Sequence, residues 1–226
     1  MDCLKKHLIG LSIIGGWRID NFVLGVVDFK NSNSRSISNT LDYLEIPNIR
    51  SLSVQDLNQA SGLIIPGVGA FGALVEQLSD ETLVEFIISK KNLGIPFLGV
   101  CLGMQIMFEC SEESENVSGL NWIPGRMQKM KTSANIRVPH VGWNSVYQIK
   151  DNPIFADIPN DSDFFFCHSY KVNAANDSVI GWTNHGENFG SVVTQENLFG
   201  AQFHPEKSQI HGLQFLKNFE KIVRQC

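Results

Sequence analysis

The chain has 226 residues, of which 43% are hydrophobic and 18% charged, and its formal net charge is −5. This length and composition exclude intrinsic disorder and predict one globular domain, or at most two small ones, whose core needs no disulfide framework or structural metal. The 23 acidic residues outnumber 18 Lys and Arg, and no long basic run is present, which argues against nucleic acid as a partner.

The cysteines are odd in number and scattered, without the spacing of a metal site or a disulfide framework, so we expect a reducing, cytoplasmic compartment. The apolar run Leu8–Trp17 follows Lys5 and Lys6, as in a signal peptide. No A-x-A-like cleavage site follows, and the run is too short to span a membrane. We expect an N-terminal arm over residues 1–21, for which disorder is one interpretation, followed by a single domain over residues 22–226.

Apolar strands alternate with helical patterns in the first half, which is typical of βαβ units and a parallel sheet. The expected strands are Phe22–Asp28, Gly62–Pro66 and Ile95–Val100. The expected helices are Ser34–Leu44, Gly72–Leu78, Glu81–Lys91 and Gly103–Cys110.

The second half consists of short β-like segments joined by Asn, Asp and Gly turns, which predict mostly antiparallel hairpins. These segments are Ser145–Ile149, Asp163–Cys167, Ser178–Trp182, Gly190–Thr194 and Leu198–Phe203. Apolar residues then recur at helical spacing from Leu213 to Val223, which predicts a terminal amphipathic helix over the sheet. The fold class expected is α/β, with three layers, a central mixed sheet and antiparallel additions in the second half.

Cys101 is the first candidate for chemistry, because it follows a buried strand at a sharp turn and Gly103 opens the next helix. This is the geometry of a nucleophile elbow that presents a thiol. Free N–H groups and the positive end of a helix dipole at that turn favour the reactive thiolate. The alternative is that Cys101 is a small buried apolar residue, as most free cysteines are.

A thiolate nucleophile needs a base, and the base needs a group to orient it. His204 and Glu206 lie two residues apart at the end of a predicted strand, so their side chains can point the same way, with Pro205 stiffening the segment. Glu206 can then fix the imidazole tautomer. A surface hydrogen bond between one His and one Glu is the alternative.

Donors for an oxyanion are the third requirement, and the glycine-rich turn Pro66–Phe71 can supply backbone N–H groups after an apolar strand. A structural βα turn is the alternative, and the fingerprint of a dinucleotide site is missing. The remaining histidines show no cluster spacing, and we expect surface or hydrogen-bonded core roles for them: His7, His140, His168, His185 and His211.

Together these segments resemble the class I, or triad-type, glutamine amidotransferases. Within that family they are most similar to the glutaminase subunits of imidazole glycerol phosphate synthases, over roughly residues 23–224. The segments that carry the resemblance are PGVGAF (Pro66–Phe71), GVCLGMQ (Gly99–Gln105), VPHVGWN (Val138–Asn144), HSY (His168–Tyr170) and HPEKSQ (His204–Gln209). The resemblance implies a flavodoxin-like fold, with Cys101 at the carboxyl edge of the parallel strands, and no cofactor or metal.

The resemblance also assigns a role to individual residues. It implies Cys101 as nucleophile, His204 as general base and acid, and Glu206 as the group that orients His204. The residues it implies for the oxyanion hole and for binding glutamine are Gly67, Val68, Gly69 and Leu102, together with Gln105, Ser169 and Tyr170.

The implied partner is a separate (β/α)8 cyclase subunit that forms a heterodimer with this chain and uses the ammonia to make imidazole glycerol phosphate and AICAR in histidine biosynthesis. Asn33, Trp143, Tyr170 and Lys207 are implied at that interface. One departure concerns the loop after the first strand, where the family pattern D-Y-G-x-G-N-L is replaced by Asp28-Phe-Lys-Asn-Ser-Asn-Ser. Both glycines are lost, at Lys30 and Ser32, and this puts the usual partner in question.

Three functional hypotheses follow. The first is a glutaminase that supplies ammonia for imidazole glycerol phosphate synthesis. The second is the same glutaminase serving another synthase, such as one that aminates a nucleotide sugar of a surface polysaccharide. The third is a catalytically weak regulatory partner, against which the intact residues of the triad argue. The triad alone would also suit a cysteine hydrolase of another amide, and glutamine is favoured only through the resemblance.

Overall fold

The computed structural model describes residues 13–14, 17–18, 22–78, 80–134, 136–173 and 175–226. The predicted N-terminal arm lies outside the described residues, apart from the short antiparallel pair β1 (Ile13–Ile14) and β2 (Trp17–Arg18). The arm and its boundary therefore stay predictions. None of the helices within these ranges is both long and apolar enough to cross a membrane.

The first half of the chain builds the parallel part of the sheet, as predicted. Three of its strands come from the apolar runs identified in the sequence, β3 (Leu24–Val27), β5 (Gly62–Gly67) and β6 (Phe97–Cys101). The edge strand β4 (Asn48–Ser51) was not predicted, because its polar sequence NIRS has no apolar run. Parallel pairing gives the order β14-β6-β5-β3-β4, where β14 (Leu198–Ala201) comes from the second half.

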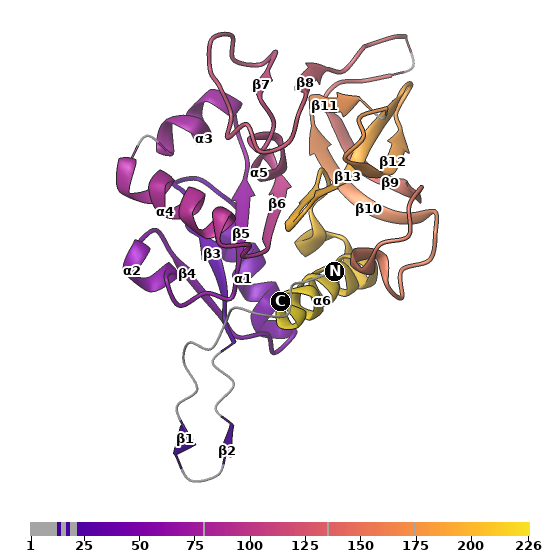
Figure 1. Cartoon of the computed structure of the whole chain (residues 1–226). Helices are drawn as coiled ribbons and strands as arrows, with labels where there is room; N and C mark the ends of the chain where they lie inside the picture. Colours follow the sequence, from indigo (N-terminus) through magenta and orange to yellow (C-terminus); the bar gives the residue numbers. More distant parts are fainter. Residues whose placement is uncertain (1–12, 15–16, 19–21, 79, 135, 174) are drawn as a thin grey trace.

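The second half continues the same sheet with antiparallel strands, in the order β10-β9-β12-β13-β14. These are β10 (Ser162–His168), β9 (His140–Gln148), β12 (Val179–Asn184) and β13 (Asn188–Gln195). A side branch adds β11 (Tyr170–Asn173), β8 (Arg126–Lys129) and β7 (Cys110–Ser111). The predicted mixed sheet is therefore confirmed, and Figure 1 shows its two halves side by side.

Helices cover both faces of the parallel strands, which gives the three layers. Successive residues of a strand point to opposite faces. On β5, Leu63 and Ile65 therefore pack with α2 (Val54–Leu57), α3 (Phe71–Gln77) and α4 (Glu81–Asn92). Ile64 packs on the other face with α1 (Ser34–Tyr43) and α6 (Gln209–Gln225). Each fully buried side chain of this kind stabilises the fold by about 1.5–3 kcal/mol.

The helix predicted over Gly103–Cys110 is wrong in length. The observed helix α5 spans Leu102–Gln105, and Cys110 lies in β7. Backbone N–H groups of the 119–123 segment bond the carbonyls of residues 106–109, including Leu120 N–H to Ile106 O at 2.7 Å. These long-range partners replace the intrahelical bonds that would extend the helix, and the sequence pattern does not reveal them.

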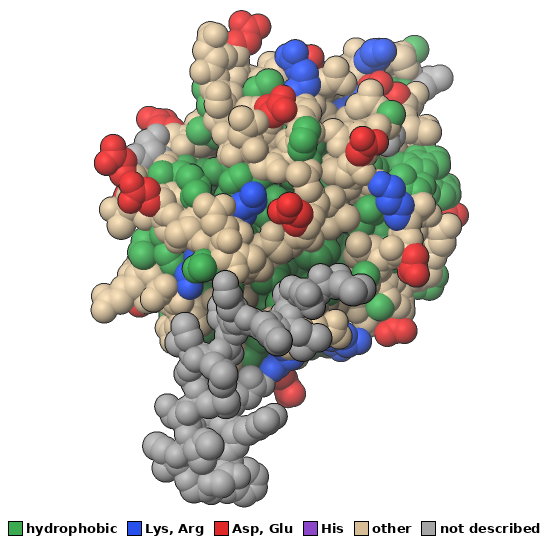
Figure 2. Space-filling view, in the orientation of Figure 1, with side chains coloured by type: hydrophobic (Ala, Val, Ile, Leu, Met, Phe, Trp, Pro, Cys, Tyr) green, Lys and Arg blue, Asp and Glu red, His purple; other side chains and the backbone are tan. Residues whose placement is uncertain are grey.

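The surface in the view of Figure 2 carries Asp, Glu, Lys and Arg side chains dispersed among polar and apolar ones. No broad field of one charge sign appears on that face. The view gives no sign of the basic stripe that a phosphate backbone would need.

Candidate active site

Cys101 ends β6 and stands at the turn into α5, with a left-handed backbone at φ 53° and ψ −110°. A non-glycine residue in that region is strained, and such strain is concentrated at functional sites. Two glycines make the tight turn possible. A Cβ on Gly103 would lie 1.8 Å from the carbonyl oxygen of Ile65, and one on Gly99 would lie 2.6 Å from Gly103 O. The strand, sharp turn and helix predicted for a nucleophile elbow are all present.

His204 and Glu206 form a buried pair, with His204 Nδ1 at 2.9 Å from Glu206 Oε1. The two side chains are 2% and 0% exposed. The expectation that strand periodicity brings them together is wrong, because β14 ends at Ala201. A 3-10 helix, η2 (Pro205–Lys207), turns the chain between them, with the fixed φ of Pro205 suiting its first position.

The protonation state of His204 is set by its burial and by its contacts with Cys101 and Glu206. Burial lowers the pKa of His204. Hydrogen bonds and charge interactions with Cys101 and Glu206 together raise it by more than burial lowers it, so the pKa reaches about 10. The imidazolium form of His204 is therefore favoured beside the Cys101 sulfur at neutral pH. An imidazolium next to a sulfur favours the thiolate, which is the nucleophile.

Asn33 also lies in this cluster, although the resemblance implied it at the partner interface. Its Nδ2 donates to Glu206 Oε1 at 2.7 Å and lies 3.3 Å from His204 Nδ1. The loop that presents Asn33 lacks the family's glycines, yet it makes its turn with Asn31 at φ 59°. Asn tolerates this left-handed conformation better than most residues, so the loop keeps its turn without glycine.

The segment expected to form the oxyanion hole lies directly beside the elbow. Gly67 is the register partner of Cys101 across β5 and β6. A Cβ on Gly67 would lie 2.7 Å from Gly103 N and 2.8 Å from Leu102 Cβ, so the two turns touch. Val68 is 40% exposed and Gly69 has φ 97°, a conformation that favours glycine. The roles of these backbone groups stay predictions.

Gln105 connects the elbow to the segment after β10. Its Nε2 donates to Tyr170 O at 3.2 Å and to Gln202 Oε1 at 3.0 Å. Gln202 in turn donates from Nε2 to Cys101 Sγ at 3.7 Å. Sequence reasoning missed Gln202, and its only signal was an amide in the last apolar strand, two residues before His204.

Three of the histidines that show no cluster spacing in the sequence lie together in the structure. His140 Nδ1 lies 3.0 Å from His168 Nε2, and the His140 and His185 rings stack at 4.1 Å. The first two are the hydrogen-bonded core residues that the sequence predicted, and His168 Nδ1 lies 2.9 Å from Tyr170 O. Strands β9 and β10 place His140 opposite His168, a register that sequence separation does not show.

Glu113 is another residue near the site that sequence reasoning missed. Its Oε2 accepts from Phe71 N–H at 2.7 Å, and the neighbouring Ser114 Oγ accepts from Gly72 N–H at 3.0 Å. These side chains fix the start of α3 directly after the glycine-rich turn. They lie in a polar segment with no motif, so no local pattern singles them out.

Trp143 and Lys207 lie on the surface near the triad, around the ring of Phe165. Trp143 is 48% exposed, with its ring 6.1 Å from that of Phe165, and the Lys207 ammonium lies 5.8 Å from the same ring. Val141, on the same strand as Trp143, is 58% exposed. This apolar surface with a basic rim has the composition of a protein interface.

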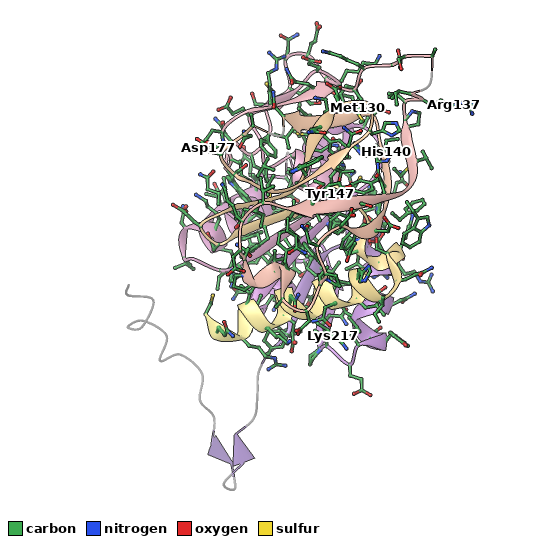
Figure 3. The ribbon with its side chains drawn as sticks, turned by 90° about the vertical axis from the view of Figure 1, so that its right-hand side faces the viewer. Met130, Arg137, His140, Tyr147, Asp177 and Lys217 are labelled. Atoms are coloured by element: carbon green, nitrogen blue, oxygen red, sulfur yellow. The ribbon has the colours of Figure 1, made fainter. Side chains whose placement is uncertain are left out.

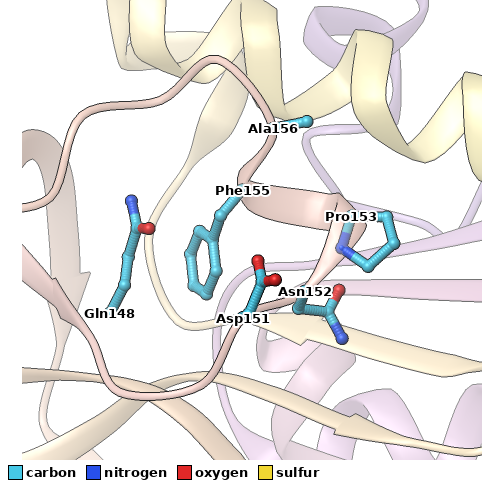
Figure 4. A pocket seen from close by; sticks show the side chains of 6 residues that line it. All are labelled: Gln148, Asp151, Asn152, Pro153, Phe155 and Ala156. Carbon is cyan, nitrogen blue, oxygen red and sulfur yellow. The ribbon is translucent and has the colours of Figure 1, made fainter.

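Two cavities of the described structure lie away from the triad. The smaller, about 240 Å³, lies between the end of β9 and η1 (Pro153–Phe155), with Gln148 and Phe155 in its wall (Figure 4). The larger, about 500 Å³, is lined by residues of the opposite end of the sheet, such as Pro96 and Asn197. Among the residues placed by the structure, no three side chains converge as metal ligands would.

Comparison with known proteins adds independent information. The family model for class I glutamine amidotransferases matches residues 25–222. The chain belongs to this family. It is 40% identical over 203 residues to "Imidazole glycerol phosphate synthase subunit HisH" of Methanocaldococcus jannaschii, covering 89% of this chain and 100% of that protein. The protein of the same name from Moorella thermoacetica is 39% identical, with 90% and 96% covered.

Two solved structures of this fold have lower sequence identity to this chain. A putative GMP synthase subunit from Thermoplasma acidophilum superposes with a TM-score of 0.67 at 18% identity, covering 90% of this chain and 94% of its own. PurLQS from Thermotoga maritima gives a TM-score of 0.67 at 15% identity, covering 89% and 98%. These likenesses show the fold, and family membership makes the chain a glutaminase enzyme.

Proposed function

We propose that this glutamine amidotransferase hydrolyses glutamine to glutamate and ammonia, and supplies the ammonia to a cyclase subunit that makes imidazole glycerol phosphate in histidine biosynthesis. The observation that carries the chemistry is the strained Cys101 next to the buried His204–Glu206 pair. The assignment of the product is supported by relatives at 36–40% identity over most of the chain, all named "Imidazole glycerol phosphate synthase subunit HisH".

In the proposed reaction the Cys101 thiolate attacks the side-chain amide carbon of glutamine. The developing oxyanion is held by the N–H groups of Val68 and Leu102, for which a peptide in the Gly67–Gly69 turn has to reorient. His204 gives its Nε2 proton to the leaving nitrogen, so the C–N bond breaks and ammonia departs. Glu206 keeps Nδ1 protonated throughout.

The second half of the reaction removes the glutamyl group from the sulfur. His204, now neutral, takes a proton from water, and the hydroxide attacks the thioester carbon. The C–S bond breaks, glutamate leaves and the thiolate is restored beside the imidazolium. The raised pKa of His204, about 10, supports a resting imidazolium–thiolate pair that is ready for the first step.

Glutamine recognition is proposed for the groups that surround the sulfur. Gly69 and Gln105 contact the amino-acid end of the substrate, and backbone groups of Ser169 and Tyr170 complete the site. Gln105 is 3% exposed and bonded to Tyr170 O, which supports a rigid binding surface.

The proposed partner is a (β/α)8 cyclase subunit that forms a heterodimer with this chain. The exposed surface of Val141, Trp143 and Lys207 supports a docking site beside the triad. Asn33 bonds Glu206, so a partner that contacts its loop could act directly on the catalytic pair. The free thiols of Cys101, Cys110 and Cys167 support the proposal of a reducing, cytoplasmic compartment.

A second candidate is the same glutaminase serving another synthase. The observation that favours it is the loop over residues 28–34, where Lys30 replaces a glycine and bonds Gln77 through both backbone groups, at 2.7 and 3.4 Å. Those bonds tie the loop to α3, and Lys30 has less backbone freedom than the glycine of the family pattern. The synthase encoded beside this chain separates the two candidates.

The proposal is tested by measuring glutamate release from glutamine with the chain alone, with the cyclase, and with the cyclase and its ribonucleotide ligand. We expect release that depends on cyclase and ligand and is lost in Cys101→Ala. No release with a verified active cyclase, while release appears with another synthase, would replace the first candidate by the second.

A further inference from the structure

Gln202 is a buried side chain that none of the roles above explains. It follows β14, is 0% exposed and uses its backbone N–H to bond Ser191 O at 2.9 Å. Its amide lies between two functional residues, with Oε1 3.0 Å from Gln105 Nε2 and Nε2 3.7 Å from Cys101 Sγ. We propose that Gln202 is a positioning residue that holds a hydrogen-bond donor against the Cys101 thiolate and connects that donor to Gln105.

The orientation of the Gln202 amide is decided by a backbone carbonyl. Tyr170 O can only accept, so the Gln105 group that faces it at 3.2 Å must be the NH2 group. The same nitrogen faces the Gln202 amide, which must then present its oxygen there. The NH2 group of Gln202 is left to face the sulfur, and the opposite orientation would place two donors together and an oxygen against the thiolate.

The Tyr170 carbonyl is itself held by a second directed set of bonds. Asn144 Nδ2 lies 3.2 Å from His140 Nε2, which must accept, so the neutral His140 carries its proton on Nδ1. That proton is donated to His168 Nε2, and His168 Nδ1–H is donated to Tyr170 O. The donor at the sulfur is thus fixed by a network that extends from β9 to Cys101.

A donor at the sulfur matters because the thiol and the thiolate need different partners. The thiol can donate to Cys167 O, at 3.8 Å. The thiolate has no proton to donate, so the partial negative charge of the Cys167 carbonyl oxygen repels it. Among the described side chains, Gln202 and His204 both present a donor to the ionised sulfur. A hydrogen bond to a charged group is stronger than one to a neutral group, so Gln202 favours the ionised form.

Other titratable groups near the sulfur have defined states. His204 is held as imidazolium by Glu206, and His168 is buried, with a pKa lowered to about 3 mainly by desolvation. His140 lies behind His168, and its pKa is lowered to about 4 by burial and by His185. The pKa values of His204, His168 and His140 all lie outside the range from about pH 5 to about pH 8, so these three groups keep their charge there while the thiolate population of Gln202→Met is compared with that of the unchanged protein.

This inference concerns the same site as the proposed function and rests on it to that extent. Its test needs neither glutamine nor a partner. The thiolate fraction of Cys101 is measured against pH by ultraviolet absorbance, as the difference between each protein and the same protein carrying Cys101→Ser. Gln202→Met keeps the size of the side chain and removes the donor. We expect about tenfold less thiolate at a given pH below the midpoint.

Two further variants separate positioning from general damage to the site. Gln105→Met removes the bond that orients the Gln202 amide without touching the sulfur, and we expect a smaller shift in the same direction. Ser191→Ala is the matched control, because Ser191 is buried, its backbone carbonyl accepts from the Gln202 N–H, and its side chain lies outside the proposed machinery. It should titrate like the unchanged protein.

An unchanged thiolate titration in folded Gln202→Met would overturn the proposal. If Gln202→Met does not fold, Gln105→Met decides, and an unchanged titration there overturns the proposal equally. Shifted titrations together with no glutamate release under any partner condition would uphold the role of Gln202 and reject the proposed function, so the two failures are distinguishable.

Discussion

The buried pair His140 and His168 predicts a specific loss of stability in acid. Both side chains are almost inaccessible, at 3% and 6% exposed, and both are neutral in the folded protein (Figure 3 labels His140 on β9). Burial is the main cause that lowers the pKa of His140 to about 4 and of His168 to about 3. The unfolded chain takes up these protons near pH 6.5, so it binds more protons in acid, and stability falls as the pH drops below that value.

The size of the stability loss depends mainly on the pKa of each histidine in the unfolded chain. Between about pH 7.5 and about pH 5 the unfolded chain gains a proton on each histidine while the folded protein does not, which costs about 2 kcal/mol for each of them. His204 acts in the opposite sense. Its pKa is raised to about 10, so its stabilising contribution is complete below about pH 6.5 and is lost as the pH rises towards 10.

The assay is urea unfolding followed by circular dichroism at both pH values, for the unchanged protein and for His140→Gln and His168→Gln. Comparing each variant with the unchanged protein cancels the contribution of His204. We expect each variant to lose about 2 kcal/mol less than the unchanged protein on acidification. The same substitution at His211, which lies outside this cluster, is the matched control. Equal acid losses in all four proteins would refute the account of a buried neutral pair.

Three further predictions concern the site and its partner. Gly103→Ala places a Cβ 1.8 Å from Ile65 O, so we expect the free energy of unfolding in urea to fall by about 3 kcal/mol. An unchanged urea midpoint would contradict the close packing of this turn. Asn33→Ala removes the 2.7 Å bond to Glu206, and about tenfold lower kcat with little change in KM for glutamine is expected in partner-dependent glutamate release. Trp143→Ala should weaken the binding of the cyclase, measured by calorimetry, by about 2 kcal/mol. An unchanged affinity would mean that the interface does not include Trp143.

The parallel half of the fold was predictable because its strands are short apolar runs bounded by turn residues. β3, β5 and β6 all fall within or next to the expected segments. The polar edge strand β4 and the early end of α5 were not predictable. The first lacks an apolar pattern, and the second depends on hydrogen bonds to a segment more than a dozen residues away.

The residues of the proposed triad could be selected from the sequence because they stand in short motifs with a chemical rationale. The supporting groups were not. Gln202, Glu113 and the His140–His168 contact depend on which strands pair and in which register, and nothing in the local sequence gives that pairing. The resemblance implies Asn33 at the partner interface, and its bond to Glu206 becomes visible only in the folded chain.

The proposed reaction requires that Cys101 attacks glutamine. The decisive experiment is to quench the enzyme with acid during turnover with its cyclase and to search for a glutamyl adduct by peptide mass spectrometry. We expect the adduct on the peptide that contains Cys101, and none in Cys101→Ala. Glutamate release without any adduct on Cys101, or with undiminished activity in Cys101→Ala, would contradict it.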